Sequence, residues 1–97
     1  MYCLLTALVM TQNPALDEER RAARDTALRS NDPLSALGSL ARALELAEHE
    51  AAPNAPGALL ELVARDARAP LAKDEASYRL LERAVRAGDL VEARRLA

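Results

Sequence analysis

Apolar side chains recur every three or four residues along most of this chain, the spacing that gathers them on one face of an α-helix. The clearest stripe predicts a helix over about residues 33–51. Leu46 falls outside this stripe, beside Ser35 and Ser39, and so predicts a second contact surface on the same helix. The stripe itself consists of Leu34, Leu37, Leu40, Ala41, Leu44, Ala47 and Ala51.

Proline, glycine and capping residues divide the chain into six predicted helices. Asn13-Pro14 and Asp32-Pro33 are typical helix starts, because the first residue caps the helix and proline suits its first turn. Gly88 fits the left-handed position that ends a helix. The predicted helices cover residues 2–10, 14–30, 33–51, 57–68, a segment from a cap at Asp74 to residue 87, and a last segment capped by Asp89.

This pattern predicts an all-α fold, a compact bundle of about five to six short helices in a single domain over residues 1–97. Stacking of helical hairpins into a solenoid-like array is one arrangement of such a bundle. Ala and Leu supply 40 of the 97 residues, and Phe, Trp and Ile are absent. Because strands draw on β-branched and aromatic residues, this composition excludes a sheet and predicts a core of Leu, Val and Ala.

The first ten residues have Thr6 as their only polar side chain. Ten residues are too few to cross a bilayer, which takes about 20, and no Lys or Arg precedes Arg20 to form the basic region of a signal peptide. A short helix that is apolar on all sides must be covered by its own domain or by another subunit. We therefore expect contacts with a protein partner or a second copy at Tyr2, Leu4, Leu5, Leu8, Val9 and Leu46.

The single cysteine, Cys3, cannot form an internal disulfide, and a reducing, cytoplasmic location is the simplest interpretation. The net charge of −2 is unevenly spread. Residues 1–62 carry five Arg and nine acidic residues, whereas residues 63–97 carry seven Arg, one Lys and six acidic residues. Neither half is basic or acidic enough to require nucleic acid or a membrane surface as a partner.

A row of arginines in the last third is the candidate nucleic-acid contact. At 100° per residue, Arg79, Arg83 and Arg86 fall within about 60° of one another on a helix. Two further arginines extend this row toward the C-terminus, so the set could follow a phosphate backbone. In the alternative interpretation, Glu75 and Glu82 pair with the arginines four residues later on a solvated face. No aromatic residue interleaves the row to stack on bases. The row consists of Arg79, Arg83, Arg86, Arg94 and Arg95.

His49, with Glu45 and Glu48, is the one place that suggests metal or acid–base chemistry. A metal site takes three or four ligands, and the chain has no other His and a single, distant Cys. Three isolated glycines cannot form a phosphate-binding loop. We expect no metal, no cofactor and no small-molecule substrate, and hence no enzyme; an unrecognised enzyme is the most distant alternative.

The segment LLERAVRAGDLVEARRLA, residues 80–97, resembles the middle of a tetratricopeptide repeat. Gly88, Asp89 and Ala93 match the turn and the small residue that follows it, and Leu80 stands where the first helix of the repeat usually has Leu. The resemblance implies stacked helical hairpins. The segment departs from the repeat where the family prefers large aromatic residues, at Ser77 and Ala84.

The segment NDPLSALGSLARALELAEHEAAPN, residues 31–54, is similar to a helix near the start of the small subunit in some CRISPR surveillance complexes. The match rests on Leu37, Gly38, Leu40, Leu44 and Glu45. Those subunits are all-helical and non-enzymatic and line nucleic acid in a filament. The resemblance implies a small ribonucleoprotein subunit that contacts the nucleic-acid backbone. This function is the alternative to our first expectation, a non-catalytic protein-interaction module or structural subunit of an assembly.

Overall fold

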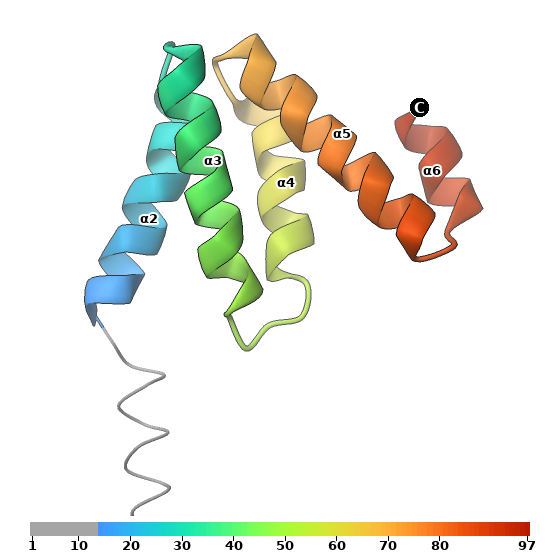
Figure 1. Ribbon diagram of the computed structural model, residues 1–97, viewed down its shortest axis with the longest axis horizontal. Helices are drawn as coiled ribbons and strands as arrows, with labels where there is room; N and C mark the ends of the chain where they lie inside the picture. The colour runs from blue at the N-terminus through green and yellow to red at the C-terminus, as the bar shows by residue number, and fades with distance from the viewer. Residues whose placement is uncertain (1–13) are drawn as a thin grey trace, which may run out of the picture.

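The computed structural model describes residues 14–97 and has five helices in this range and no strand, so the predicted all-α fold is confirmed (Figure 1). The predicted helix at residues 2–10, with the contact residues Tyr2, Leu4, Leu5, Leu8 and Val9, lies outside the described residues. The five helices are α2 (Pro14–Arg29), α3 (Pro33–Glu48), α4 (Ala55–Asp66), α5 (Pro70–Arg86) and α6 (Leu90–Leu96).

Two of the predicted caps are present. The backbone N–H of Ser35 donates to Asp32 Oδ2 at 3.1 Å, and that of Glu92 donates to Asp89 Oδ1 at 3.0 Å. Each bond satisfies a backbone donor that the helix start leaves without an intrahelical acceptor.

Other predicted boundaries were wrong. Helix α5 starts at Pro70, so Asp74 lies inside the helix and does not cap it. The backbone of Ala69 is extended, with φ −78° and ψ 120°, as expected before a proline that is preset for a helical first turn. Helix α4 starts at Ala55, two residues early, because Pro56 fits its first turn. Helix α3 ends at Glu48, which leaves Ala51 in the following turn.

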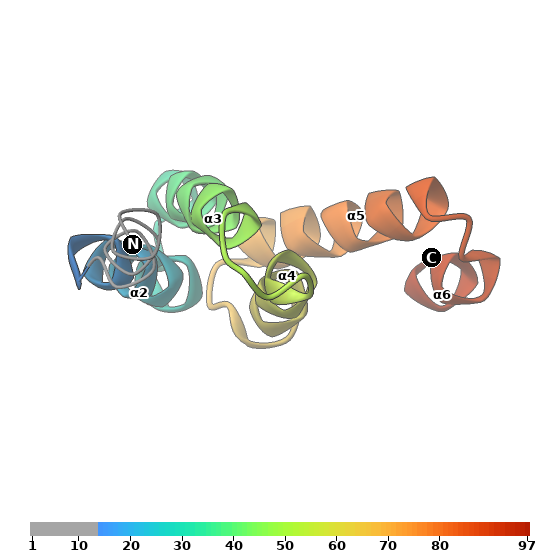
Figure 2. The same cartoon turned by 90° about the horizontal axis from the view of Figure 1, so that it is seen from below.

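The helices form two layers. Consecutive helices run antiparallel (Figure 1), and Figure 2 shows α3 and α5 in one layer with α2, α4 and α6 in the other. The most extensive contacts join α2 with α3 and α4 with α5, while α6 packs on α5, and α3 also packs on α4 and α5. The bundle is flat, with principal extents of 49 × 34 × 15 Å. Each layer therefore keeps one face that no other described helix covers.

The core is built from small side chains. Leu60 and Val63 of α4 are the largest side chains that are fully buried. Alanine supplies most of the remainder, and its small side chain allows helix axes to approach closely. The core consists of Ala27, Ala36, Leu40, Ala43, Leu44, Ala47, Leu59, Leu60, Val63, Ala67, Ala69, Ala72 and Ala76.

Helix α3 is rotated relative to the predicted stripe. Helix α2 covers one side of α3, and α4 and α5 cover another, so its buried arc is broad and includes Ala36 and Ala43. Leu46 is 6% exposed within this arc, so the prediction that it forms a second contact surface was wrong. Leu34, predicted to be in the core, is 79% exposed, and Ala41 is exposed as well.

The turn between α5 and α6 has the predicted left-handed glycine, because Gly88 has φ +73°. The N–H of Gly88 donates to the carbonyl oxygen of Val85 at 3.1 Å, and that of Asp89 donates to Ala84 at 2.9 Å. These two bonds form a Schellman motif, which closes the end of α5 and reverses the chain into α6.

Gly88→Val is expected to lower the free energy of unfolding by about 1–3 kcal/mol, because a β-branched residue is strained at positive φ. A Cβ at this position meets no atom within 4 Å, so the cost comes from the backbone alone. Gly88→Asn is the matched control, since Asn tolerates the left-handed region better. Urea unfolding of both variants tests this, and equal free energies would contradict the role given to the turn.

Candidate protein-contact surface

The outer face of the α3 and α5 layer carries large apolar side chains in contact with solvent. On α5, Leu71, Tyr78 and Val85 are 52%, 60% and 58% exposed. They are seven residues apart, which places them in a line along two-turn steps of the helix. On α3, Leu34 and Ala41 have the same spacing. We call the whole set the α3/α5 face: Leu34, Leu37, Ala41, Leu71, Tyr78 and Val85.

A groove of about 260 Å³ separates the two helices on this face. Its apolar wall comes from α3, and its polar wall is the ion pair on α5 in which Arg79 Nε donates to Glu75 Oε1 at 2.9 Å. The charged pair of Glu75 and Arg79 therefore lies between the apolar wall on α3 and the exposed apolar residues of α5. It is lined by Leu37, Leu40, Ala41, Leu44, Glu75 and Arg79.

Helix α5 buries three alanines and exposes three of its larger apolar residues, while Leu80 packs against the core. Ala72 and Ala76 are fully buried and Ala84 is nearly so, while Tyr78 on the other side points away from α4. Folded proteins usually bury Leu and Val in preference to leaving them in water, and contiguous exposed apolar residues are typical of an interaction surface. This face was not among the predicted contact surfaces, because apolar periodicity does not separate Tyr78 and Val85 from the apolar residues of α5 that meet the core. The seven-residue spacing was the signal that could have revealed it.

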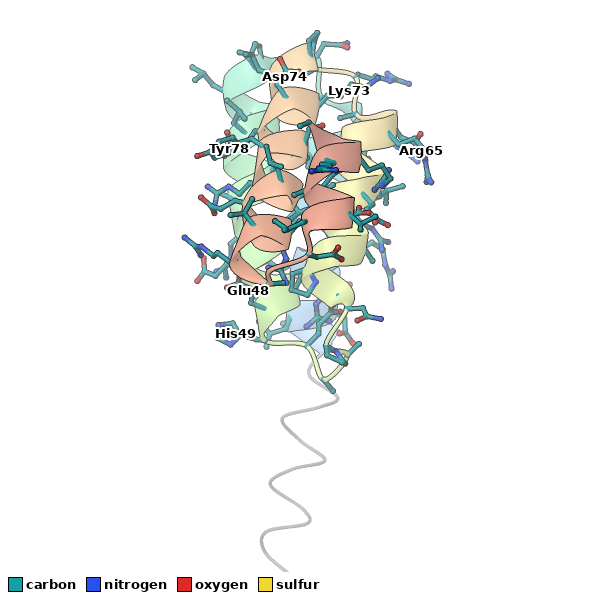
Figure 3. All side chains as sticks on the ribbon, turned by 90° about the vertical axis from the view of Figure 1, so that its right-hand side faces the viewer. Glu48, His49, Arg65, Lys73, Asp74 and Tyr78 are labelled. Atoms are coloured by element: carbon teal, nitrogen blue, oxygen red, sulfur yellow. The ribbon has the colours of Figure 1, made fainter. Side chains whose placement is uncertain are left out.

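Carboxylates flank the apolar residues of the α3/α5 face. Asp74, Glu75 and Glu82 lie three or four residues from Leu71 or Tyr78, and so share their side of α5. Glu45 and Glu48 follow Ala41 by four and seven residues on α3. In Figure 3, Tyr78, Glu48 and His49 lie on one side of the bundle and Arg65 lies on the opposite side.

The arginines of the α3/α5 face are already paired. Arg79 binds Glu75, and the guanidinium of Arg86 lies 3.8 Å from the carboxylate of Glu82. Within residues 14–97, neither Asp74 nor Glu48 takes part in an ion pair. The unpaired charge on this face is therefore negative.

Arg83 and Arg86 of the predicted row line one groove beside α4 and α6, whereas Arg79 borders α3. Arg79 lies in the groove against α3, whereas Arg83 lies in grooves against α4, one of them about 400 Å³ and shared with Glu61. Arg86 is exposed, and Arg94 and Arg95 lie on α6. Arg95 Nε donates to Glu92 Oε2 at 2.8 Å, and this hydrogen bond lowers the pKa of Glu92.

His49 is the C-cap residue of α3, and Glu45, one turn earlier, lies 3.2 Å from Arg42. Among residues 14–97, no group of three His, Cys, Asp or Glu side chains is arranged to hold a metal ion. No helix in the same range is long and apolar enough to span a bilayer.

Comparison of the chain with protein-family models, with curated proteins and with solved structures finds no significant match. The tetratricopeptide-like and CRISPR-type resemblances therefore rest on their sequence motifs alone.

Proposed function

We propose that this protein is a non-catalytic helical interaction module, or structural subunit of an assembly, that binds another protein through the α3/α5 face. The observation that carries the proposal is the exposed line of Leu71, Tyr78 and Val85 beside an apolar groove. We further propose that the module needs no cofactor or small-molecule substrate. The lone Cys3 supports a cytoplasmic location.

Burial of these side chains is the driving force that we propose for binding. Removal of apolar surface from water contributes about 25 cal/mol per Å². Tyr is among the residues that most often dominate interface energies, because it combines a large rigid ring with a polar hydroxyl. Tyr78 is therefore the proposed anchor of the contact.

Purification of the intact chain from the cell that produces it, with and without nuclease treatment, tests this function. A discrete protein should accompany the chain at constant stoichiometry, and nuclease should not remove it. A chain that is monomeric and free of any partner, or whose partner leaves on nuclease treatment, would contradict the proposal.

The alternative function is a nucleic-acid contact by the arginines of α5 and α6. It has less support, because Arg79, Arg86 and Arg95 each have a carboxylate partner within the chain. If the arginines bind phosphates, changing Arg79, Arg83 and Arg86 to Gln should lower the slope of log affinity against log salt by about two to three. We expect no such change, because we expect no nucleic-acid affinity beyond weak general attraction. Filter binding to RNA and DNA at several salt concentrations measures this slope.

A further inference from the structure

We propose that the α3/α5 face binds an amphipathic helix whose apolar stripe is flanked by Lys or Arg. This inference rests on the proposed protein-contact function and names the class of partner segment. Two observations carry it, the geometry of the apolar residues and the sign of the charges beside them.

The geometry favours a helix as the bound segment. Leu71, Tyr78 and Val85 repeat every seven residues along α5, and Leu34 and Ala41 repeat in the same way on α3. Apolar residues at this spacing pack against a partner helix whose own apolar residues recur every three or four positions. The groove between α3 and α5 is open to solvent, and Glu75 and Arg79 form its wall on α5. A helix of about the length of α5, roughly 25 Å, could lie along the groove.

The charges favour basic residues on that helix. Of the five carboxylates beside the face, those of Glu45, Glu75 and Glu82 pair with arginines of their own helices, Arg42, Arg79 and Arg86. The other two, of Glu48 and Asp74, form no ion pair in the described residues. A basic residue of the partner can therefore pair with Asp74 and another with Glu48.

The same charges argue against the other occupants. Two copies of this chain that met through the α3/α5 face would bring their carboxylates together, which repels. Residues 1–13 carry no charged side chain, so this segment would leave the carboxylates unmatched. The sign of the face therefore points to a basic segment of a different protein.

A panel of three labelled peptides of 17 residues, the length of α5, tests the inference on the full chain by fluorescence anisotropy. The first has a Leu stripe at helical spacing flanked by Lys and Arg. The second has the same stripe flanked by Glu, and the third has the composition of the first in an order without a stripe. The first should bind at least about tenfold more tightly than either of the others, and added salt should weaken it.

Matched variants locate the contact. Asp74→Lys and Glu18→Lys each replace the negative charge of an exposed, unpaired carboxylate with a positive charge. Asp74 is the fifth residue of α5, and Glu18 is the fifth residue of α2. The first should weaken binding of the Lys-flanked peptide about tenfold, because it removes an ion-pair partner, and the second should do so much less. Tyr78→Ser should also weaken it, whereas Val91→Ser on α6 should not.

Each remaining outcome overturns the inference. If the Glu-flanked peptide binds as tightly as the Lys- and Arg-flanked peptide, or more tightly, and Tyr78→Ser weakens that binding, the proposed charge of the partner helix is wrong. The proposed protein-contact function is then unaffected. Equal binding of the stripe-free peptide shows general attraction between opposite charges. If the chain forms a dimer and Tyr78→Ser dissociates it, the occupant of the face is a second copy of the chain. If the double variant Leu5→Ser, Leu8→Ser binds the peptide more tightly, the occupant is the N-terminal segment. If no peptide binds, the purification experiment decides the proposed function separately.

Discussion

Leu60→Ala is expected to lower the free energy of unfolding by about 2–5 kcal/mol, the largest loss of stability among the variants proposed for this chain. Leu60 is fully buried in α4, where it packs into a core in which most other side chains are alanines. Alanine neighbours have no long side chains that could move in to fill the space, so the cavity should remain open. Urea unfolding followed by circular dichroism measures the loss.

Leu34→Ala is the matched control, because it makes the same chemical change at a residue that is 79% exposed. We expect it to change the free energy of unfolding by no more than about 0.5 kcal/mol, as is usual for surface substitutions. Similar losses in the two variants would show that α3 is not rotated as described, and that Leu34 belongs to the core.

The double variant Leu71→Ser, Tyr78→Ser is expected to weaken binding to the protein partner at least about thirtyfold, because loss of a central anchor typically costs about 2 kcal/mol or more. Both side chains are more than half exposed, so the helical signal and the melting temperature should change little. Isothermal titration of the co-purified partner measures the affinity.

Val91→Ser is the control for that double variant. Val91 is 83% exposed on α6, which lies in the other layer (Figure 2), so its substitution removes exposed apolar surface outside the residues of the proposed contact. Partner affinity that is unchanged in the double variant, or reduced equally by Val91→Ser, would contradict the location of the contact.

Local signals explain why the helices could be predicted from the sequence. The caps at Asp32 and Asp89 and the left-handed glycine at position 88 depend on a few neighbouring residues, and the structure has all three. The start of α5 was misplaced because Asp74 is a good cap by type, while the preset geometry of Pro70 begins the helix one turn earlier.

The buried faces could not be predicted in the same way, because they depend on contacts between distant segments. Helix α5 has two apolar lines, one of Ala72 and Ala76 and one that includes Leu71 and Tyr78. Periodicity alone does not decide which line meets the core, and side-chain size favours the wrong one. On α3, Leu46 appeared to lie off the stripe because a single stripe assumes one neighbour, whereas α3 has neighbours on two sides.

The surroundings of the arginine row could not be predicted for a related reason. A helical projection places Arg79 and Arg83 close together, but α3 and α4 flank α5 on either side of that arc. Arg79 therefore borders α3, and Arg83 borders α4. The carboxylates beside the α3/α5 face come from two helices that are far apart in the sequence. That they lie on the same side of the bundle is evident only from the structure, in which α3 and α5 form one layer (Figure 2).

Photo-crosslinking from position 78 tests the central claim, that the α3/α5 face contacts a protein. Tyr78 is replaced by a photoreactive benzoylphenylalanine in the full chain, and position 91 on α6 receives the same residue as a control. Irradiation in the producing cell should link position 78 to one discrete protein and link position 91 much less, although Val91 is the more exposed residue. Crosslinks of equal yield from both positions, crosslinks to nucleic acid, or none from position 78 would contradict the account.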